Sequence, residues 1–150
     1  MAKYRSIDPE YVSQIIKEYT HWTLSIHDNQ HYLGRCYIWR VREGGMQRLS
    51  GITTEELLEL HVVLKELEAA LKELWQPDHM NYAWLGNFFQ LHDGHGHMHV
   101  IPRYKTPRTF DGRIHTDERW GKNYSPTSPY ELDEEALFRI RDAIKEAIIQ

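Results

Sequence analysis

A long amphipathic stretch in the middle of the chain shows the clearest hydrophobic pattern. Leucines recur at steps of three and four from Leu57 to Leu74, and a Thr53-x-x-Glu56 pattern typical of a helical capping box precedes them. Pro77 marks the end of the stretch. We therefore predict a long helix that covers a sheet, with a dimer contact as a secondary use of the same stripe.

The two ends of the chain also carry apolar residues at helical spacing. Asp8-Pro9-Glu10 is typical of a helix start, and the apolar residues that follow predict a short helix over 8–19. Near the other end, Asp133 is the expected cap of a last helix whose apolar stripe includes Ile140 and Ile144.

Strand patterns fill much of the remaining sequence. Trp22, Leu24 and Ile26 alternate with polar residues, which predicts a half-buried strand. Further strands are expected near 35–41, 80–87 and 95–101, and residues 104–130 are expected to form an ordered surface loop. Pro102 should end the central pairing of the strand that it follows. Strands in series with helices set apart favour an α+β fold with an antiparallel sheet.

Length and charge narrow the class of protein. The 150 residues favour one domain, and the net charge of −4 gives no indication of broad attraction to nucleic acid. The single cysteine, Cys36, cannot form an internal disulfide, which fits a reducing compartment. The sequence has no long apolar span and no apolar signal region at its start, so we expect a cytoplasmic protein without a membrane partner.

The segment LHDGHGHMHVIPRY, residues 91–104, raises the question of function. His95, His97 and His99 are two residues apart, so on a strand their imidazoles lie along one face. This pattern has three interpretations: a structural cluster, a metal site, and a histidine nucleophile. A metal site would need further ligands, and His92 and Asp93 are the nearest candidates. A neutral imidazole is also a good nucleophile toward activated phosphorus, with flanking imidazoles to contact phosphate oxygens.

The decapeptide HGHMHVIPRY resembles the histidine triad motif, His-φ-His-φ-His-φ-φ, in the version followed by Pro-Arg-Tyr. WTLSIHDNQHYLGRCYIW, LSGITTEELLELHVVLKELEAAL and MNYAWLGN are similar, in this order, to the family's paired N-terminal strands, its long helix and the strand before the triad. RWGKNY, residues 119–124, is similar to a bacterial subgroup of the family.

The resemblance implies a fold and an assembly. It implies one domain over residues 1–150, with its core at about 20–104 and a C-terminal loop and helix at 105–150. The implied fold is α+β, with an antiparallel sheet of about five strands packed with a long helix, plus N- and C-terminal helices. It further implies a homodimer that binds a small-molecule nucleotide.

The resemblance also assigns chemical roles to the histidines. In the family, the middle histidine attacks the α-phosphorus of a nucleoside phosphate derivative, and water then releases the nucleotide from a nucleotidyl-histidine intermediate. Here that nucleophile is His97, and His95 and His99 take the flanking roles of orientation and phosphate contact. No cofactor is required for the covalent step, although the substrate can arrive as a magnesium complex.

Four further residues are candidate substrate contacts, each with a structural alternative. The resemblance places Asn29 at the ribose hydroxyls and Asn87 at phosphate or the leaving group, although both also suit turns. Gln90 lies in the lengthened loop before the triad and is a candidate phosphate contact. Arg103 has two candidate partners, a phosphate group and a carboxylate of the fold.

Three departures from the family pattern concern the surroundings of His97. Gly96 stands where an apolar side chain is expected, and residues 88–94 lengthen the link between Asn87 and the triad. Many family members have a histidine where this chain has Arg35, so a proton-relay role cannot be transferred to that position.

We therefore expect a nucleotide hydrolase or nucleotidyl transferase that cleaves phosphoanhydrides or phosphoramidates, dinucleoside polyphosphates among them. Two alternatives stay open. One is a nucleotide-binding or partner-binding protein that lacks efficient chemistry. The other is a metal enzyme that uses His95, His97 and His92.

Overall fold

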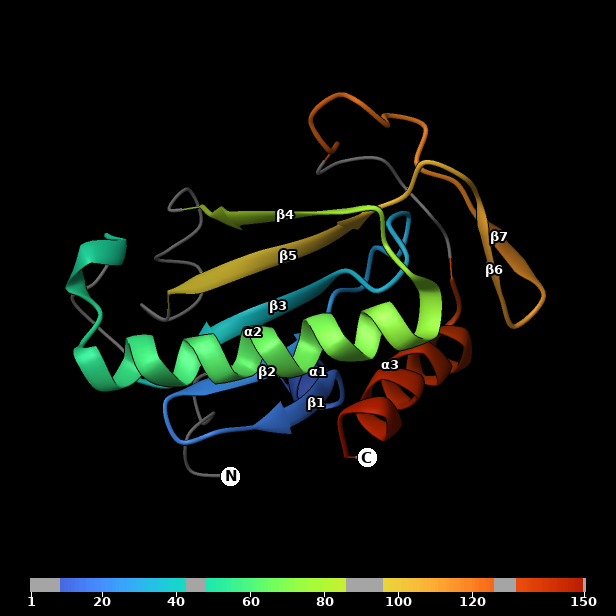
Figure 1. Cartoon of the computed structure of the whole chain (residues 1–150). Helices are drawn as coiled ribbons and strands as arrows, with labels where there is room; N and C mark the ends of the chain where they lie inside the picture. The colour runs from blue at the N-terminus through green and yellow to red at the C-terminus, as the bar shows by residue number, and fades with distance from the viewer. Residues whose placement is uncertain (1–8, 43–47, 86–95, 126–131, 150) are drawn as a thin grey trace.

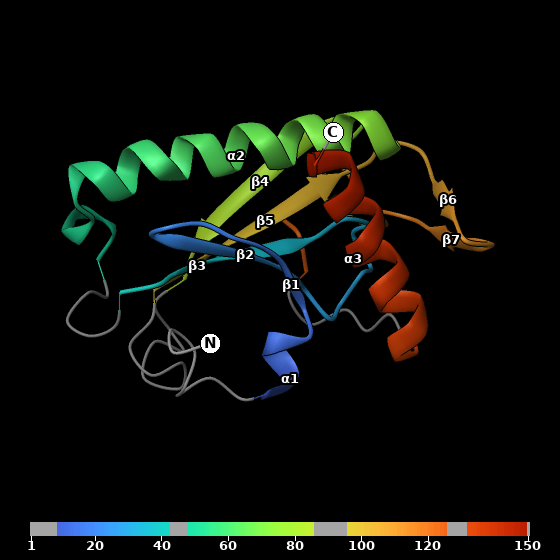
Figure 2. The same ribbon diagram turned by 90° about the horizontal axis from the view of Figure 1, so that it is seen from below.

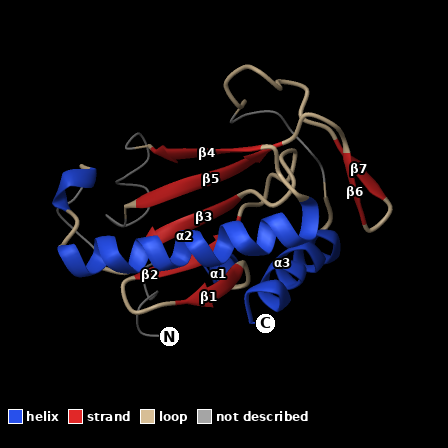
Figure 3. Ribbon diagram, viewed as in Figure 1, coloured by secondary structure: helices blue, strands red, loops and turns tan. Residues whose placement is uncertain are grey.

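A five-stranded antiparallel sheet forms the centre of the molecule (Figures 1 and 3). The structure is a computed structural model, and it describes residues 9–42, 48–85, 96–125 and 132–149. The strands lie in the order β1-β2-β3-β5-β4, which confirms the expected α+β class. Their bounds are β1 (Ile15–Glu18), β2 (Trp22–Ile26), β3 (Cys36–Arg40), β4 (His79–Trp84) and β5 (His97–Arg103).

Helix α2 (Thr54–Trp75) covers one face of this sheet, as Figure 2 shows, and follows the short 3₁₀ helix η2 (Leu49–Gly51). The predicted capping box is present: the Thr53 hydroxyl accepts the Glu56 N–H at 3.1 Å, and the Glu56 carboxylate accepts the Thr53 N–H at 2.8 Å. Leu67 and Leu71 are fully buried, whereas Leu57 is 55% exposed. The leucine stripe therefore predicted the helix correctly but not every residue of its buried side.

Helix α3 (Glu134–Ile149) packs against α2, β1 and β2. Its start confirms the predicted cap, because the Asp133 carboxylate accepts the N–H of Ala136 at 2.7 Å. Ile140 and Ile144 are buried, as expected. Neither α3 nor any other described helix combines the length and apolar character that a membrane span requires.

The strand register assigns the histidines to one face of the sheet. In the pairing of β3 with β5, Trp39 lies opposite His97 and Tyr37 lies opposite His99. Paired residues project to the same side, so these four side chains share a face. Val100 projects to the other face and belongs to the core beneath α2. The described histidines of the triad therefore lie on the face opposite α2.

The predicted helix over 8–19 is wrong in its second half. Helix α1 spans only Pro9–Val12, and the chain then forms β1, which pairs antiparallel with β2. The apolar spacing was compatible with a helix, but β-branched Ile15 and Ile16 also favour a strand. The edge of β2 supplies hydrogen-bond partners, and Ile16 becomes buried in the core. Tertiary pairing thus overrides the local pattern.

The segment 104–130, expected to be a loop, contains a hairpin of β6 (Arg108–Phe110) and β7 (Arg113–His115). Asp111 and Gly112 connect the strands with positive φ angles of 54° and 76°. Asp-Gly in this conformation is the preferred sequence of a two-residue hairpin turn. The dipeptide was therefore the sequence signal that the loop prediction missed.

Pro102 affects the two neighbours of β5 differently. The pairing of β5 with β3 stops at Val100, whereas its pairing with β4 continues through Arg103. Proline has no N–H to donate, so it suits a position where only one side of the strand is paired. The expected end of central pairing is confirmed, but the strand itself continues.

Candidate functional site

Strand β5, between β3 and β4, places His97 and His99 on the face of the sheet opposite α2. Their ring centroids lie 5.1 Å apart, and the residues are 5% and 8% exposed. Strand alternation brings the two imidazoles to the same side, as the sequence predicted. Two adjacent imidazoles offer both a ring nitrogen that can attack and N–H groups that can bind an anion.

Aromatic side chains of β3 surround the two imidazoles. The Trp39 ring lies 4.6 Å from the His97 ring, and the Tyr37 ring lies 4.9 Å from the His99 ring, between centroids. The ring of Tyr11, in α1, packs against that of Trp39, with 6.2 Å between the ring centroids. These rings restrict the orientation of the imidazoles and remove apolar surface from water around them.

Arg35, just before β3, contacts His99 directly. Its Nη2 lies 3.3 Å from Nδ1 of His99, and the residue is only 1% exposed. Within the described part of the chain, Nε and Nη1 of this guanidinium have no hydrogen-bond partner. Burial lowers the pKa of Arg35 from its ordinary value, but a guanidinium still stays protonated in a protein.

His27, which was not predicted as a site residue, also belongs to this cluster. Its ring lies 4.4 Å from that of Tyr37 and 5.7 Å from that of His99. Burial lowers the pKa of His27, against the opposing effect of the Asp28 carboxylate 3.1 Å away. The signal was present in the polar alternation of β2, because the polar face of that strand is the face that carries the histidines.

Asn29 lies in the turn after β2, close to His27. Its backbone N–H donates to Nδ1 of His27 at 2.9 Å, and its side-chain oxygen accepts the N–H of His31 at 3.0 Å. The side chain thus has the turn role that the sequence allowed. Its position beside the cluster leaves ribose contact as a prediction.

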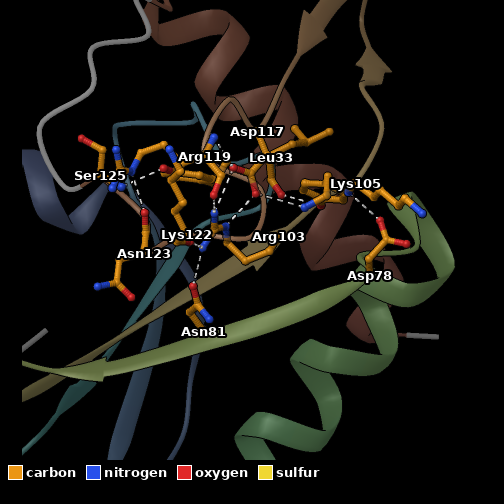
Figure 4. A network of polar contacts seen from close by, with 12 residues as sticks. Leu33, Asp78, Asn81, Arg103, Lys105, Asp117, Arg119, Lys122, Asn123 and Ser125 are labelled. Carbon is orange, nitrogen blue, oxygen red and sulfur yellow. Dashed lines mark hydrogen bonds and ion pairs between the residues drawn. The ribbon is translucent and has the colours of Figure 1, made fainter.

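Arg103 is buried and bound within the fold (Figure 4). Its guanidinium donates to both carboxylate oxygens of Asp117, at 2.6 and 3.0 Å, and to the Asn81 side chain at 2.8 Å. It also donates to the backbone carbonyls of Arg119 at 2.8 Å and Lys122 at 2.9 Å. These five bonds match the five N–H donors of an arginine. Of the two partners expected from the sequence, the structure shows the carboxylate.

Tyr104 completes the structural explanation of the Pro-Arg-Tyr sequence. Its buried hydroxyl donates to the carbonyl of Leu33 at 2.6 Å, and burial raises its pKa. Next to Leu33, in the segment between β2 and β3, Gly34 has a φ of 91°. A Cβ added there would lie 2.7 Å from Cδ2 of Leu71. This glycine is required both by its backbone conformation and by the close approach of α2.

Three of the predicted site residues, His95, Asn87 and Gln90, lie outside the described residues, and so do His92 and Asp93. Their roles stay predictions. Among the residues that are described, no group of three or more histidine, cysteine, aspartate or glutamate side chains is arranged to hold a metal ion.

Neither a protein-family model nor a curated protein matches the sequence. Solved structures do match: a histidine triad protein from Sinorhizobium meliloti superposes with a TM-score of 0.70 over 95% of this chain and 96% of that chain, at 16% identity. The chain has the histidine triad fold.

Two further solved structures share the histidine triad fold with this chain. A hypothetical histidine triad nucleotide-binding protein from Sulfolobus tokodaii is 18% identical, with a TM-score of 0.62 over 91% of this chain and 83% of that chain. A Zn-bound histidine triad family protein from Mycobacterium smegmatis is 18% identical, with a TM-score of 0.54 over 88% and 84%. The fold that the motif implied is therefore confirmed.

Proposed function

We propose that the chain is a nucleotide hydrolase or nucleotidyl transferase that acts on the α-phosphate of nucleoside phosphate derivatives through His97. The supporting observation is the placement of His97 beside His99 on the sheet face opposite α2, in a histidine triad fold, with 5.1 Å between ring centroids. The alternation of β5 gives both imidazoles the same direction, so one phosphate group can contact both.

The proposed reaction has two displacements at phosphorus. In the first, a ring nitrogen of His97 attacks the α-phosphorus, a P–N bond forms, and the bond to the leaving group breaks. The leaving group departs with the electron pair and takes up a proton. In the second, water attacks phosphorus and loses a proton, which replaces the one given to the leaving group; the P–N electron pair returns to the ring nitrogen, and the nucleoside monophosphate leaves. An acceptor alcohol or amine in place of water gives transfer.

The surroundings of His97 fit this chemistry. The attacking nitrogen must be unprotonated, and the aromatic side chains of Trp39 and Tyr37 hold the imidazoles in a poorly hydrated setting. His99 can donate a hydrogen bond to a phosphate oxygen as charge develops in the transition state. Substrates are expected among dinucleoside polyphosphates and nucleoside phosphoramidates.

Replacement of the nucleophile tests this proposal. His97→Ala should lower kcat with diadenosine tetraphosphate or adenosine phosphoramidate by about a thousandfold or more, because the covalent route is lost. His61→Ala removes an exposed histidine of α2 and should leave turnover unchanged. Far-UV circular dichroism verifies folding. Wild-type rates in folded His97→Ala protein would refute the proposal.

A binding protein without efficient chemistry is the second candidate, and the substitution of Arg35 for the histidine common in the family favours it. Calorimetric titration with AMP and a turnover assay on the same preparation separate the two. Binding with no turnover of either substrate class supports the second candidate, whereas turnover that depends on His97 supports the first.

A metal enzyme is the third candidate, and the Zn-bound histidine triad protein from Mycobacterium smegmatis provides the reason to test it. Metal analysis of protein prepared without a histidine tag, followed by turnover with and without a chelator, decides between metal and covalent chemistry. Stoichiometric zinc together with chelator-sensitive turnover would favour a metal site.

We further propose that the partner of the chain is a second copy of itself. Strand β4 is an edge of the described sheet, and its Tyr82 is 44% exposed and hydrogen-bonded to Glu68 of α2. Exposed Leu57 lies eleven residues before Glu68, about three helical turns along the same side. Light scattering after gel filtration should give twice the monomer mass, and Leu57→Glu should reduce it.

A further inference from the structure

Arg35 and Arg103 are both buried, but their surroundings differ. Arg103 has a carboxylate partner and hydrogen bonds for all five of its N–H groups. Arg35 differs: among the described residues its Nη2 lies 3.3 Å from Nδ1 of His99, and its Nε and Nη1 have no hydrogen-bond partner. Burying a guanidinium that is 1% exposed and has no carboxylate in direct contact among the described residues costs free energy.

The groups around Arg35 do not supply the missing negative charge. Tyr124 lies under its guanidinium, 5.5 Å from the carbon to the ring centroid, and Tyr32 and Tyr37 are also near enough to influence it. Among the described residues, Asp28 is the one carboxylate that acts on Arg35, and its carboxylate lies against His27, 3.1 Å from Nδ1. Within the described residues, the guanidinium of Arg35 therefore has no carboxylate in direct contact.

The contact between Arg35 and His99 also determines where the imidazole proton lies. A guanidinium has N–H donors and no acceptor, so it can only donate to Nδ1 of His99. Nδ1 must then be unprotonated, and the proton of the neutral ring is on Nε2. Arg35 thus selects one tautomer of His99.

We propose that Arg35 and His99 form an anion-binding pair, in which the guanidinium holds Nδ1 of the imidazole and the imidazole presents its Nε2–H to a phosphoryl oxygen of the ligand. The pair adds a specific residue to the site of the proposed function, on which it rests, but it requires only binding and no turnover. The positive charge of Arg35 is compensated when the phosphate is bound. Arg35 is a positioning residue, because it acts through His99.

Nitrogen NMR of the histidine rings tests the tautomer directly. In wild-type protein labelled with ¹⁵N-histidine, the His99 signals, assigned by their loss in His99→Gln, should be those of the Nε2–H tautomer. Arg35→Met removes the donor and should change this pattern, whereas Arg42→Met, which removes an arginine from the α2 side, should not. An Nδ1–H tautomer in wild-type protein, or an unchanged pattern in Arg35→Met, would overturn the proposal.

Titration with AMP and with inorganic phosphate tests the anion. Arg35→Met should weaken AMP binding by about tenfold or more, because it removes both the donor that fixes the His99 tautomer and a positive charge near the phosphate. Arg35→Gln keeps an N–H donor for His99 but no charge, so it should retain the tautomer and still bind AMP more weakly. Wild-type AMP affinity in folded Arg35→Gln would refute the role of the charge. If Arg35→Met does not fold, the AMP affinity of Arg35→Gln decides alone.

The two proposals fail in different ways. Absence of turnover together with Arg35-dependent AMP binding would contradict the catalytic proposal and support the anion-binding pair. Turnover that depends on His97 but is indifferent to Arg35→Gln, with unchanged AMP affinity, would support catalysis and contradict the pair.

Discussion

The buried ion pair of Arg103 and Asp117 gives the sharpest prediction about stability. The pair is bidentate, and the side chains are 5% and 0% exposed. Through Asn81, Arg119 and Lys122 the same guanidinium connects β4 and β5 to the segment that follows β7. Loss of one partner leaves the other charge buried and unpaired, which typically costs about 3–5 kcal/mol.

Arg103→Met should therefore lower the free energy of unfolding in urea by about 3–5 kcal/mol, and Asp117→Asn should also be strongly destabilising. The double variant should lose less than the sum, because the two side chains interact directly. Arg139→Met, which breaks an exposed pair with Asp111, is the control and should cost about 0–1 kcal/mol.

The structural role of Arg103 would be refuted if Arg103→Met lost AMP binding but kept its stability in urea. If Arg103→Met unfolds at the wild-type urea concentration but binds AMP much more weakly, the arginine contacts phosphate and the carboxylate is secondary. Additive effects of Arg103→Met and Asp117→Asn would likewise contradict the pair.

Three further predictions concern single positions. Gly34→Ala should destabilise the chain by about 1–3 kcal/mol in urea unfolding, because of its φ of 91° and the 2.7 Å approach of Leu71. Burial opposes ionisation of Glu56, but hydrogen bonds from Arg42 and the Thr53 amide outweigh this effect and lower its pKa from 4.5 to about 2. The ionised carboxylate therefore stabilises the fold above pH 4.5, and this stability is lost as the pH falls toward about 2. Thermal melts of Glu56→Gln should not show the loss. Burial lowers the pKa of His27, so its NMR titration midpoint should lie below 6.5 and stability should fall as the pH drops through that range; a midpoint at or above 6.5 would contradict the burial argument.

Much of the fold was predictable because several local signals agreed. The capping box at Thr53, the leucine spacing and Pro77 all indicated the same helix, and the structure has it. β1 and the hairpin were missed for different physical reasons. Ile15 and Ile16 are compatible with a helix and with a strand. The strand forms because its backbone pairs with the edge of β2, and this pairing belongs to the tertiary structure. The hairpin had a local signal, Asp111-Gly112, in a segment interpreted from composition alone.

The site was predictable to the extent that it lies on one strand. The spacing of His97 and His99 determined their common face, and the register confirms it for these two. Arg35 and His27 lie at the two ends of the turn between β2 and β3. Both contact His99 only because this turn packs against β5. Arg103 had two candidate partners in the sequence, and Asp117, fourteen residues later, was not distinguishable from other carboxylates before folding.

Mass spectrometry of the protein quenched during turnover of diadenosine tetraphosphate tests the central claim most directly. The account predicts a peptide containing His97 that carries adenylate in acid-labile linkage, and no such adduct in His97→Ala. Turnover in wild-type protein without an adduct on His97, or an adduct on another residue with undiminished turnover in His97→Ala, would contradict it.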